Sequence, residues 1–173
     1  MGPAPRRREG TRPDLPRVRP LTPPETFRSR LLRWRFNLFP AYRGTGARIT
    51  WIAPDWSEVR VRIPLSWRTR NYVGTIFGGS MYGAVDPVYM LMLIKRLGPD
   101  YIVWDREATI RFLRPGRAAL HARFRVTDEE LAAVRAALPA PGDRTDRHWA
   151  VELVDGEGEV HAVVKKAIYI RRK

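Results

Sequence analysis

Residues 71–94 read NYVGTIFGGSMYGAVDPVYMLMLI, and this stretch decides the fold of the chain. The Gly78-Gly79 pair opens a run that is apolar on every face of a helix, whereas a surface helix is apolar along one stripe. The run is shorter and more polar at its start than a membrane span, which requires about 20 apolar residues. We therefore expect a buried central helix, surrounded by a curved sheet, in which Asp86 is the one carboxylate.

Strand patterns flank this helix on both sides. Val59, Val61 and Ile63 alternate with charged residues, which is the period-2 pattern of a strand with one wet face. Asp155-Gly156-Glu157-Gly158 predicts a hairpin between the last two strands. The expected strands are residues 49–53, 58–65, 101–113, 118–126, 148–155 and 159–170. They predict an α+β fold in which about six antiparallel strands wrap around a long central helix.

Two further helices are expected outside the core. Thr22-Pro23-Pro24-Glu25 is a capping box with prolines in the first turn, so an amphipathic helix of residues 22–39 should begin there. Its apolar stripe consists of Phe27, Leu31, Trp34 and Leu38. This stripe is expected either to pack on the sheet or to lie on a membrane. Thr127 and Glu130 form a second capping box for a helix that ends near Leu138.

Length and composition set outer limits. The 173 residues correspond to one domain, and 44% hydrophobic residues suffice for a core. Cysteine is absent, which excludes disulfides and a thiolate nucleophile and is compatible with the cytoplasm, where we expect the protein. No transmembrane segment is expected.

Most of the net charge of +14 comes from the N-terminal part of the chain. Residues 1–21 are rich in arginine and proline, which predicts a disordered arm. Such an arm either attracts nucleic acid or an anionic membrane, or is a solvated tail. No specific nucleic-acid motif accompanies the charge, so basicity alone identifies no partner.

The motifs of the chain resemble those of a known superfamily. Asn71, Gly74, the Gly78-Gly79 pair and Asp86 have a pattern that is similar to that of hotdog-fold thioesterases of the phenylacetate-pathway type. About residues 25–173 resemble a less characterised hotdog branch that is known mainly as a domain of unknown function. The segments that carry this second resemblance are 37–42, 71–75, 77–80, 84–87, 89–93, 104–105, 112–117 and 169–173. The resemblance implies a single hotdog domain over residues 22–173.

The same resemblance implies catalytic residues. In these thioesterases the acid at the Asp86 position activates water or attacks directly, and the residue at the Asn71 position places the water or the carbonyl. The Gly79 N–H, at a helix N-terminus, is suited to stabilise an oxyanion. Pro87 leaves one alternative open: Asp86 lies inside a bent helix, or it is the N-cap of a helix that begins at Pro87.

Other residues are predicted to contact the substrate. They are Gly78, Phe77, Tyr82, Tyr89, Arg114 and Arg117. Phe77, where many of these enzymes have His, is expected to form a wall of the acyl tunnel. Arg114 and Arg117 either bind the phosphates of coenzyme A or are solvated residues at a strand end. Asp105 and Glu107 are either further acids of the pocket or contacts at the sheet edge and dimer interface.

We therefore expect an acyl-CoA thioesterase whose pocket lies at a subunit interface. The resembling families join two sheets edge to edge, which implies a homodimer or a homotetramer. No cofactor is expected, and no metal site, because no two histidines share metal-ligand spacing with a carboxylate. Two alternatives stay open: a non-catalytic protein that binds acyl groups or acyl-CoA, and a nucleic-acid or membrane-associated scaffold that uses the basic arm.

Overall fold

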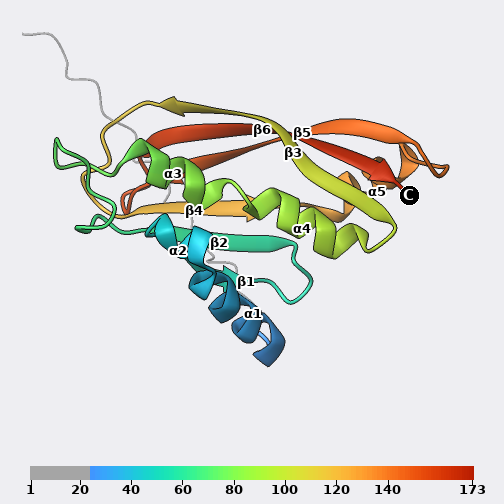
Figure 1. Ribbon diagram of the computed structural model, residues 1–173, viewed down its shortest axis with the longest axis horizontal. Helices are drawn as coiled ribbons and strands as arrows, with labels where there is room; N and C mark the ends of the chain where they lie inside the picture. Colours follow the sequence, from blue (N-terminus) through green and yellow to red (C-terminus); the bar gives the residue numbers. More distant parts are fainter. Residues whose placement is uncertain (1–23) are drawn as a thin grey trace, which may run out of the picture.

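A computed structural model describes residues 24–173 and shows one antiparallel sheet against a broken helix (Figure 1). The strands are β1 (Arg48–Ile52), β2 (Glu58–Ile63), β3 (Tyr101–Phe112), β4 (Leu120–Arg125), β5 (Arg144–Val154) and β6 (Val160–Arg172). The helices are α1 (Phe27–Leu38), α2 (Pro40–Gly44), α3 (Gly78–Val85), α4 (Val88–Leu97) and α5 (Asp128–Ala136). The strand order is β1-β2-β4-β5-β6-β3. The predicted α+β fold with six strands and a long helix is confirmed.

The strands form because apolar and polar residues alternate along them. In β2 the side chains of Val59, Val61 and Ile63 are buried, and their cross-strand partners in β4 are Phe124, Ala122 and Leu120. These pairs present one apolar face to the helix. The hairpin predicted at residues 155–158 joins β5 to β6, where the Asp155 side chain accepts the N–H groups of Glu157 and Glu159.

The central helix is broken in the middle. α3 ends at Val85 with Asp86 as its C-cap, and α4 begins after Pro87. Proline has no N–H and its ring clashes with the preceding turn, so the helix cannot run straight through this position. No side chain caps the start of α4. The alternative with a bent helix from Gly78 is therefore correct, and Asp86 is not an N-cap.

The expectation that this helix is buried on every side is wrong for α4. Val88, Met92 and Leu93 are buried against the sheet, whereas Ile94 is 37% exposed and Met90 is only partly buried. The sheet covers one side of the helix pair (Figure 1). The opposite side of α4 is left with apolar side chains that the described chain does not fully cover.

Helix α1 begins later than expected and packs by another face. Its N-cap is Thr26, whose hydroxyl accepts the Ser29 N–H, and Thr22 lies outside the described residues, as does the predicted arm. The Glu25 carboxylate pairs with Arg33 and accepts the Ile52 N–H.

The predicted apolar stripe of α1 does not pack on the sheet. Phe27 is 81% exposed and Trp34 is 62% exposed. Instead Leu32 and Phe36 pack against the core. Asn37 fixes the helix to β1, because its amide donates to the Ile49 carbonyl at 2.9 Å and accepts the Ile49 N–H at 2.8 Å. Helix α1 thereby covers the free edge of β1.

The second predicted capping box is confirmed. Thr127 and Glu130 bond reciprocally to each other's backbone N–H at the start of α5. The Glu130 carboxylate also accepts the Trp149 indole N–H, which attaches α5 to β5. In residues 24–173, no helix is long and apolar enough to cross a membrane.

Candidate active site

Asp86 lies at the break between α3 and α4, where two side chains hold its carboxylate. Its Oδ1 accepts the Tyr82 hydroxyl at 2.7 Å and the Lys166 ammonium at 2.8 Å. Lys166 also donates to the Asp86 backbone carbonyl. The Asp86 side chain is 42% exposed, so solvent reaches a carboxylate that is fixed from the protein side.

Lys166 is a residue of the candidate site that the sequence did not reveal. It lies in β6 with Val164, Ile168 and Ile170, all of which point into the core, and it is only 1% exposed. A lysine in the inward-facing register of an apolar strand is rare without a paired acid. That position in the β6 pattern was the signal in the sequence. Lys166 contacts a second acid, Asp105 of β3, whose Oδ2 lies 2.8 Å from the Lys166 Nζ.

The electrostatics of the cluster differ between its members. Burial raises the pKa of Asp105, the nearby Lys166 ammonium opposes this effect, and the charge of Asp86 adds to it. The other oxygen of Asp105, Oδ1, is buried without a hydrogen-bond partner in the described structure. Burial and the hydrogen bond to Asp86 raise the pKa of Tyr82 to about 12, so its hydroxyl stays protonated and donates.

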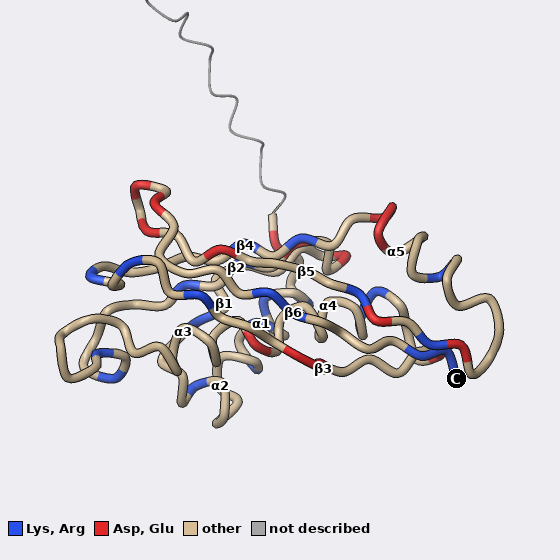
Figure 2. Tube along the Cα trace, turned by 90° about the horizontal axis from the view of Figure 1, so that it is seen from above, with Lys and Arg blue, Asp and Glu red and all other residues tan. Residues whose placement is uncertain are grey.

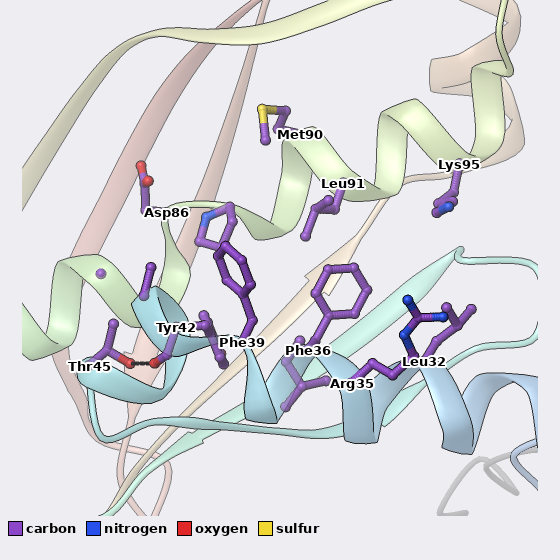
Figure 3. A pocket seen from close by; sticks show the side chains of 14 residues that line it. Leu32, Arg35, Phe36, Phe39, Tyr42, Thr45, Asp86, Met90, Leu91 and Lys95 are labelled. Atoms are coloured by element: carbon purple, nitrogen blue, oxygen red, sulfur yellow. Dashed lines mark hydrogen bonds between the residues drawn. The ribbon is translucent and has the colours of Figure 1, made fainter.

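An apolar pocket of about 840 Å³ lies between α1–α2 and α3–α4 (Figure 3). Its lining is Leu32, Arg35, Phe36, Phe39, Ala41, Tyr42, Thr45, Ile49, Gly83, Asp86, Pro87, Met90, Leu91 and Lys95. The Asp86 carboxylate points away from Tyr42 and Phe39 on the opposite wall (Figure 3). Asp86 therefore lines the pocket at the helix break, while its carboxylate points out of the cavity toward Lys166 of β6 (Figure 3).

Four other predicted site residues meet at a second pocket of about 500 Å³. They are Asn71, Gly78, Arg114 and Arg117. The Asn71 side chain is engaged within its own loop: its oxygen accepts the N–H groups of Val73 and Thr75, and its amide donates to the Thr75 hydroxyl. Asp86 does not line this pocket, so one chain does not bring Asn71 and Asp86 into the same cavity.

The two arginines of the second pocket differ in their contacts. Arg114 forms an ion pair with Glu159 at 2.9 Å and donates to the Val160 carbonyl. Arg117 is exposed at the pocket and has no ion pair with a described acid.

Aromatic rings enclose the glycine pair at the start of α3. A Cβ on Gly79 would lie 2.3 Å from the Phe77 ring, and one on Gly78 would lie 2.9 Å from the Phe112 ring. Both positions therefore require glycine for these rings to stay where they are. Because Gly79 is in the first turn, its N–H has no acceptor within the helix. Phe77 is half-exposed beside this N–H.

Tyr89, which was predicted to bind substrate, lies in the hydrophobic core. It is buried, packs against Phe124 and Trp149, and donates its hydroxyl to the Ala150 carbonyl. It lines neither pocket.

His161 lies close to two carboxylates that its sequence spacing did not indicate. One ligand atom each of Asp155, Glu159 and His161 lies within 4.8 Å of the others. These groups already have partners: His161 bonds to Asp155 and to the Pro115 carbonyl, and Glu159 pairs with Arg114. The cluster joins the β5–β6 hairpin to the loop before β4.

Comparison with solved structures identifies the fold as the hotdog fold of thioesterases. A probable thioesterase of unknown function from Pseudomonas aeruginosa, PA5026, matches with a TM-score of 0.72 and 20% identity over 83% of this chain and 95% of that chain. Thioesterase HI1161 from Haemophilus influenzae matches with a TM-score of 0.62 and 16% identity over 86% of this chain and 93% of that chain. At these identities the likeness shows the fold alone.

The family is shown by the sequence. Residues 28–170 match the family described as Domain of unknown function (DUF4442), and the chain belongs to it. This confirms the resemblance to the uncharacterised branch of the hotdog thioesterase superfamily. No curated protein sequence matches the chain.

Proposed function

We propose that this protein hydrolyses acyl-CoA thioesters, with Asp86 as the general base or the nucleophile. The observation that carries the proposal is the fixed, solvent-accessible carboxylate of Asp86, a residue that lines an apolar pocket of about 840 Å³. Hydrolysis needs such a group to activate water, together with apolar space for the acyl chain. Pocket walls formed by Phe36, Phe39 and Met90 fit an acyl chain.

In the proposed reaction, a water oxygen attacks the thioester carbonyl carbon while Asp86 takes the proton from the water. The Gly79 N–H stabilises the negative carbonyl oxygen, since helix N-termini favour negative charge. The C–S bond then breaks, and the proton held by Asp86 passes to the leaving thiolate. Asn71 holds the loop that precedes the glycine pair and orients the carbonyl or the water, and Phe77 and Tyr82 border the reacting group.

The proposed site is shared between two copies of the chain. Asp86 and the Asn71–Gly78 region line separate pockets in one copy, so a second copy is needed to bring them together. The free edge of β3 offers the place for pairing, because β3 has a neighbouring strand on one side only, whereas α1 covers the edge of β1. Two sheets joined there would form the proposed homodimer, or half of a homotetramer.

The second pocket suits the nucleotide end of the substrate. Arg114 and Arg117 would bind phosphate oxygens, with Arg117 free for this role and Arg114 exchanging Glu159 for phosphate. We place this chemistry in the cytoplasm, with which the absence of cysteine is compatible.

A second candidate function is binding of acyl-CoA without turnover. Phe77 favours it, because this apolar ring stands beside the glycine pair where many related enzymes have a polar His. The engagement of Asp86 Oδ1 by both Tyr82 and Lys166 also fits a structural role for the acid. A scaffold function of the basic arm concerns residues outside the described part of the chain.

Turnover of a panel of acyl-CoA chain lengths tests the proposal. We expect Asp86→Asn to lower kcat by about 10²–10⁴-fold while binding of a non-hydrolysable acyl-CoA thioether persists. Asp100→Asn, at an exposed acid between α4 and β3, is the matched control and should retain wild-type activity. Binding of the panel without turnover by the wild-type protein would establish the second candidate instead.

A further inference from the structure

Lys166 has all three of its ammonium protons directed at acceptors. Its Nζ donates to the Asp86 carbonyl and to Asp86 Oδ1, and it lies 2.8 Å from Asp105 Oδ2. An ammonium has three donors, and a neutral amine has two. The arrangement therefore requires the charged form of a lysine that is almost completely shielded from water.

A buried cation is stable only when acids surround it. Asp105 supplies the acid on the inner side: it lines neither pocket, and its side chain is about half as exposed as that of Asp86, 20% against 42%. Asp86 supplies the acid on the outer side. The three residues thus form a line from β3 through β6 to the break in the helix, with Asp86 as its accessible end.

The cluster contains two acids and one lysine, so the acids repel each other across the shared cation. Burial and the charge of Asp86 already raise the pKa of Asp105. The remaining donor to Asp86 is the Tyr82 hydroxyl of α3, which is neutral. The other ionisable groups of the Asp86 pocket are Arg35, Tyr42 and Lys95 on its walls. Lys166 is therefore the one cation within hydrogen-bond distance of Asp86 in the described structure.

We infer that Lys166 is the positioning residue of the proposed active site: its ammonium holds Asp86 Oδ1 and the Asp86 carbonyl so that the carboxylate keeps one orientation, while Asp105 holds the ammonium from the other side. This inference rests on the proposed function of Asp86. Within residues 24–173, both side chains that donate to the carboxylate meet Oδ1, which leaves Oδ2 for a water or a carbonyl carbon. The Lys166 bond to the Asp86 carbonyl fixes the backbone at the helix break as well.

The test is the orientation of the Asp86 side chain in Lys166→Met, measured by three-bond NMR couplings that report its χ1 rotamer. We expect one rotamer in the wild type and an average over several in the variant, because a side chain without fixed contacts populates several staggered rotamers. The kcat of the variant should fall by about 10-fold while KM changes little, because the lost interaction serves the transition state. Lys165→Met, at the exposed neighbouring lysine, should leave both unchanged.

Two further variants keep the test decisive. If Lys166→Met does not fold, Lys166→Met combined with Asp105→Asn removes the unpaired acid and should show the same averaging of the Asp86 rotamers. Asp105→Asn alone leaves the Lys166 bonds to Asp86 in place and should keep one Asp86 rotamer. Equal Asp86 couplings in wild type and the Lys166 variants would overturn the inference. The couplings require no turnover, so this outcome is separate from a failure of the thioesterase proposal.

Discussion

At the scale of single residues, Gly79 is the position where the backbone itself is proposed to act. Its N–H lies in the first turn of α3, and the Phe77 ring occupies the space where a side chain would be. The proposed role belongs to the N–H and not to the missing side chain. A pair of substitutions of which one keeps this N–H and the other removes it distinguishes the role of the N–H from the effect of adding a side chain.

We predict that Gly79→Pro lowers kcat by about 10²–10³-fold, because it removes one oxyanion donor. Proline is tolerated in the first turn of a helix, where the N–H has no helical acceptor. Gly79→Ala displaces the Phe77 ring in a similar way but keeps the N–H, so it should lose much less activity. Steady-state kinetics with one acyl-CoA measure both. Equal losses in the two variants would assign the effect to Phe77 and not to the oxyanion donor.

Sequence reasoning at this scale found the acid but not its partners. The glycine pair and Asp86 lie within one short segment, where spacing along a helix is informative. Lys166 lies 80 residues further along the chain and reaches Asp86 through the pairing of β6 with the rest of the sheet. Its position in an apolar strand pattern indicated a buried charge, but a single sequence does not indicate which acids meet it.

At the scale of elements, the outer face of the sheet is held by charge pairing between strands. Glu58 at the start of β2 contacts Arg60 at 2.7 Å, Arg123 at 2.5 Å and Arg125 at 3.3 Å. Arg125 is its direct cross-strand partner in β4. Figure 2 shows acidic and basic residues close together along β2 and β4. Burial of the Glu58 carboxyl acts to raise its pKa, but hydrogen bonds and charge from Arg123 and Arg60 outweigh this and lower it.

We predict that Glu58→Gln lowers the free energy of unfolding by about 1 kcal/mol at neutral pH. Because the pKa of Glu58 is lower in the folded state, its contribution is complete above the unfolded-state pKa. The contribution is lost as the pH falls through the folded-state pKa, so the wild type and variant should converge in acid. Urea unfolding across this range measures the difference. Glu157→Gln, in the exposed β5–β6 turn, is the control; a difference that persists in acid would contradict the ion-pair explanation.

Strands were easier to predict than the packing of α1. Alternation of apolar and charged residues fixes which face of β2 is buried, because the two faces of a strand have period 2. Helix α1 carries apolar residues on two faces, and periodicity does not say which face meets the core. The contacts of Asn37 with Ile49 and of Glu25 with Ile52 decide it, and they depend on the position of β1. The alternative in which the stripe with Phe27 and Trp34 packs on the sheet is therefore wrong, and the alternative in which it lies on a membrane stays a prediction.

At the scale of the whole molecule, the predicted site residues are divided between two regions. Asp86 lines the larger pocket at the break between α3 and α4, and Asn71 and Gly78 belong to the smaller pocket. Sequence spacing placed these residues in one site, and the structure of one chain does not. The proposed symmetric dimer would resolve this difference, because each site would then combine the acid of one copy with the glycine pair of the other.

Mixing two inactive variants tests whether the site is shared in this way. A dimer of one Asp86→Asn chain and one Gly79→Pro chain has two shared sites. One site carries both substitutions, and the other carries neither and is therefore intact. If subunits exchange freely, half of the dimers are mixed and the sample should recover about a quarter of wild-type activity. If Asp86 and Gly79 act within one chain, every site carries one substitution and mixing recovers nothing. Size-exclusion chromatography with light scattering confirms that dimers are present, and activity that depends on the mixing ratio then reports which chain supplies each group.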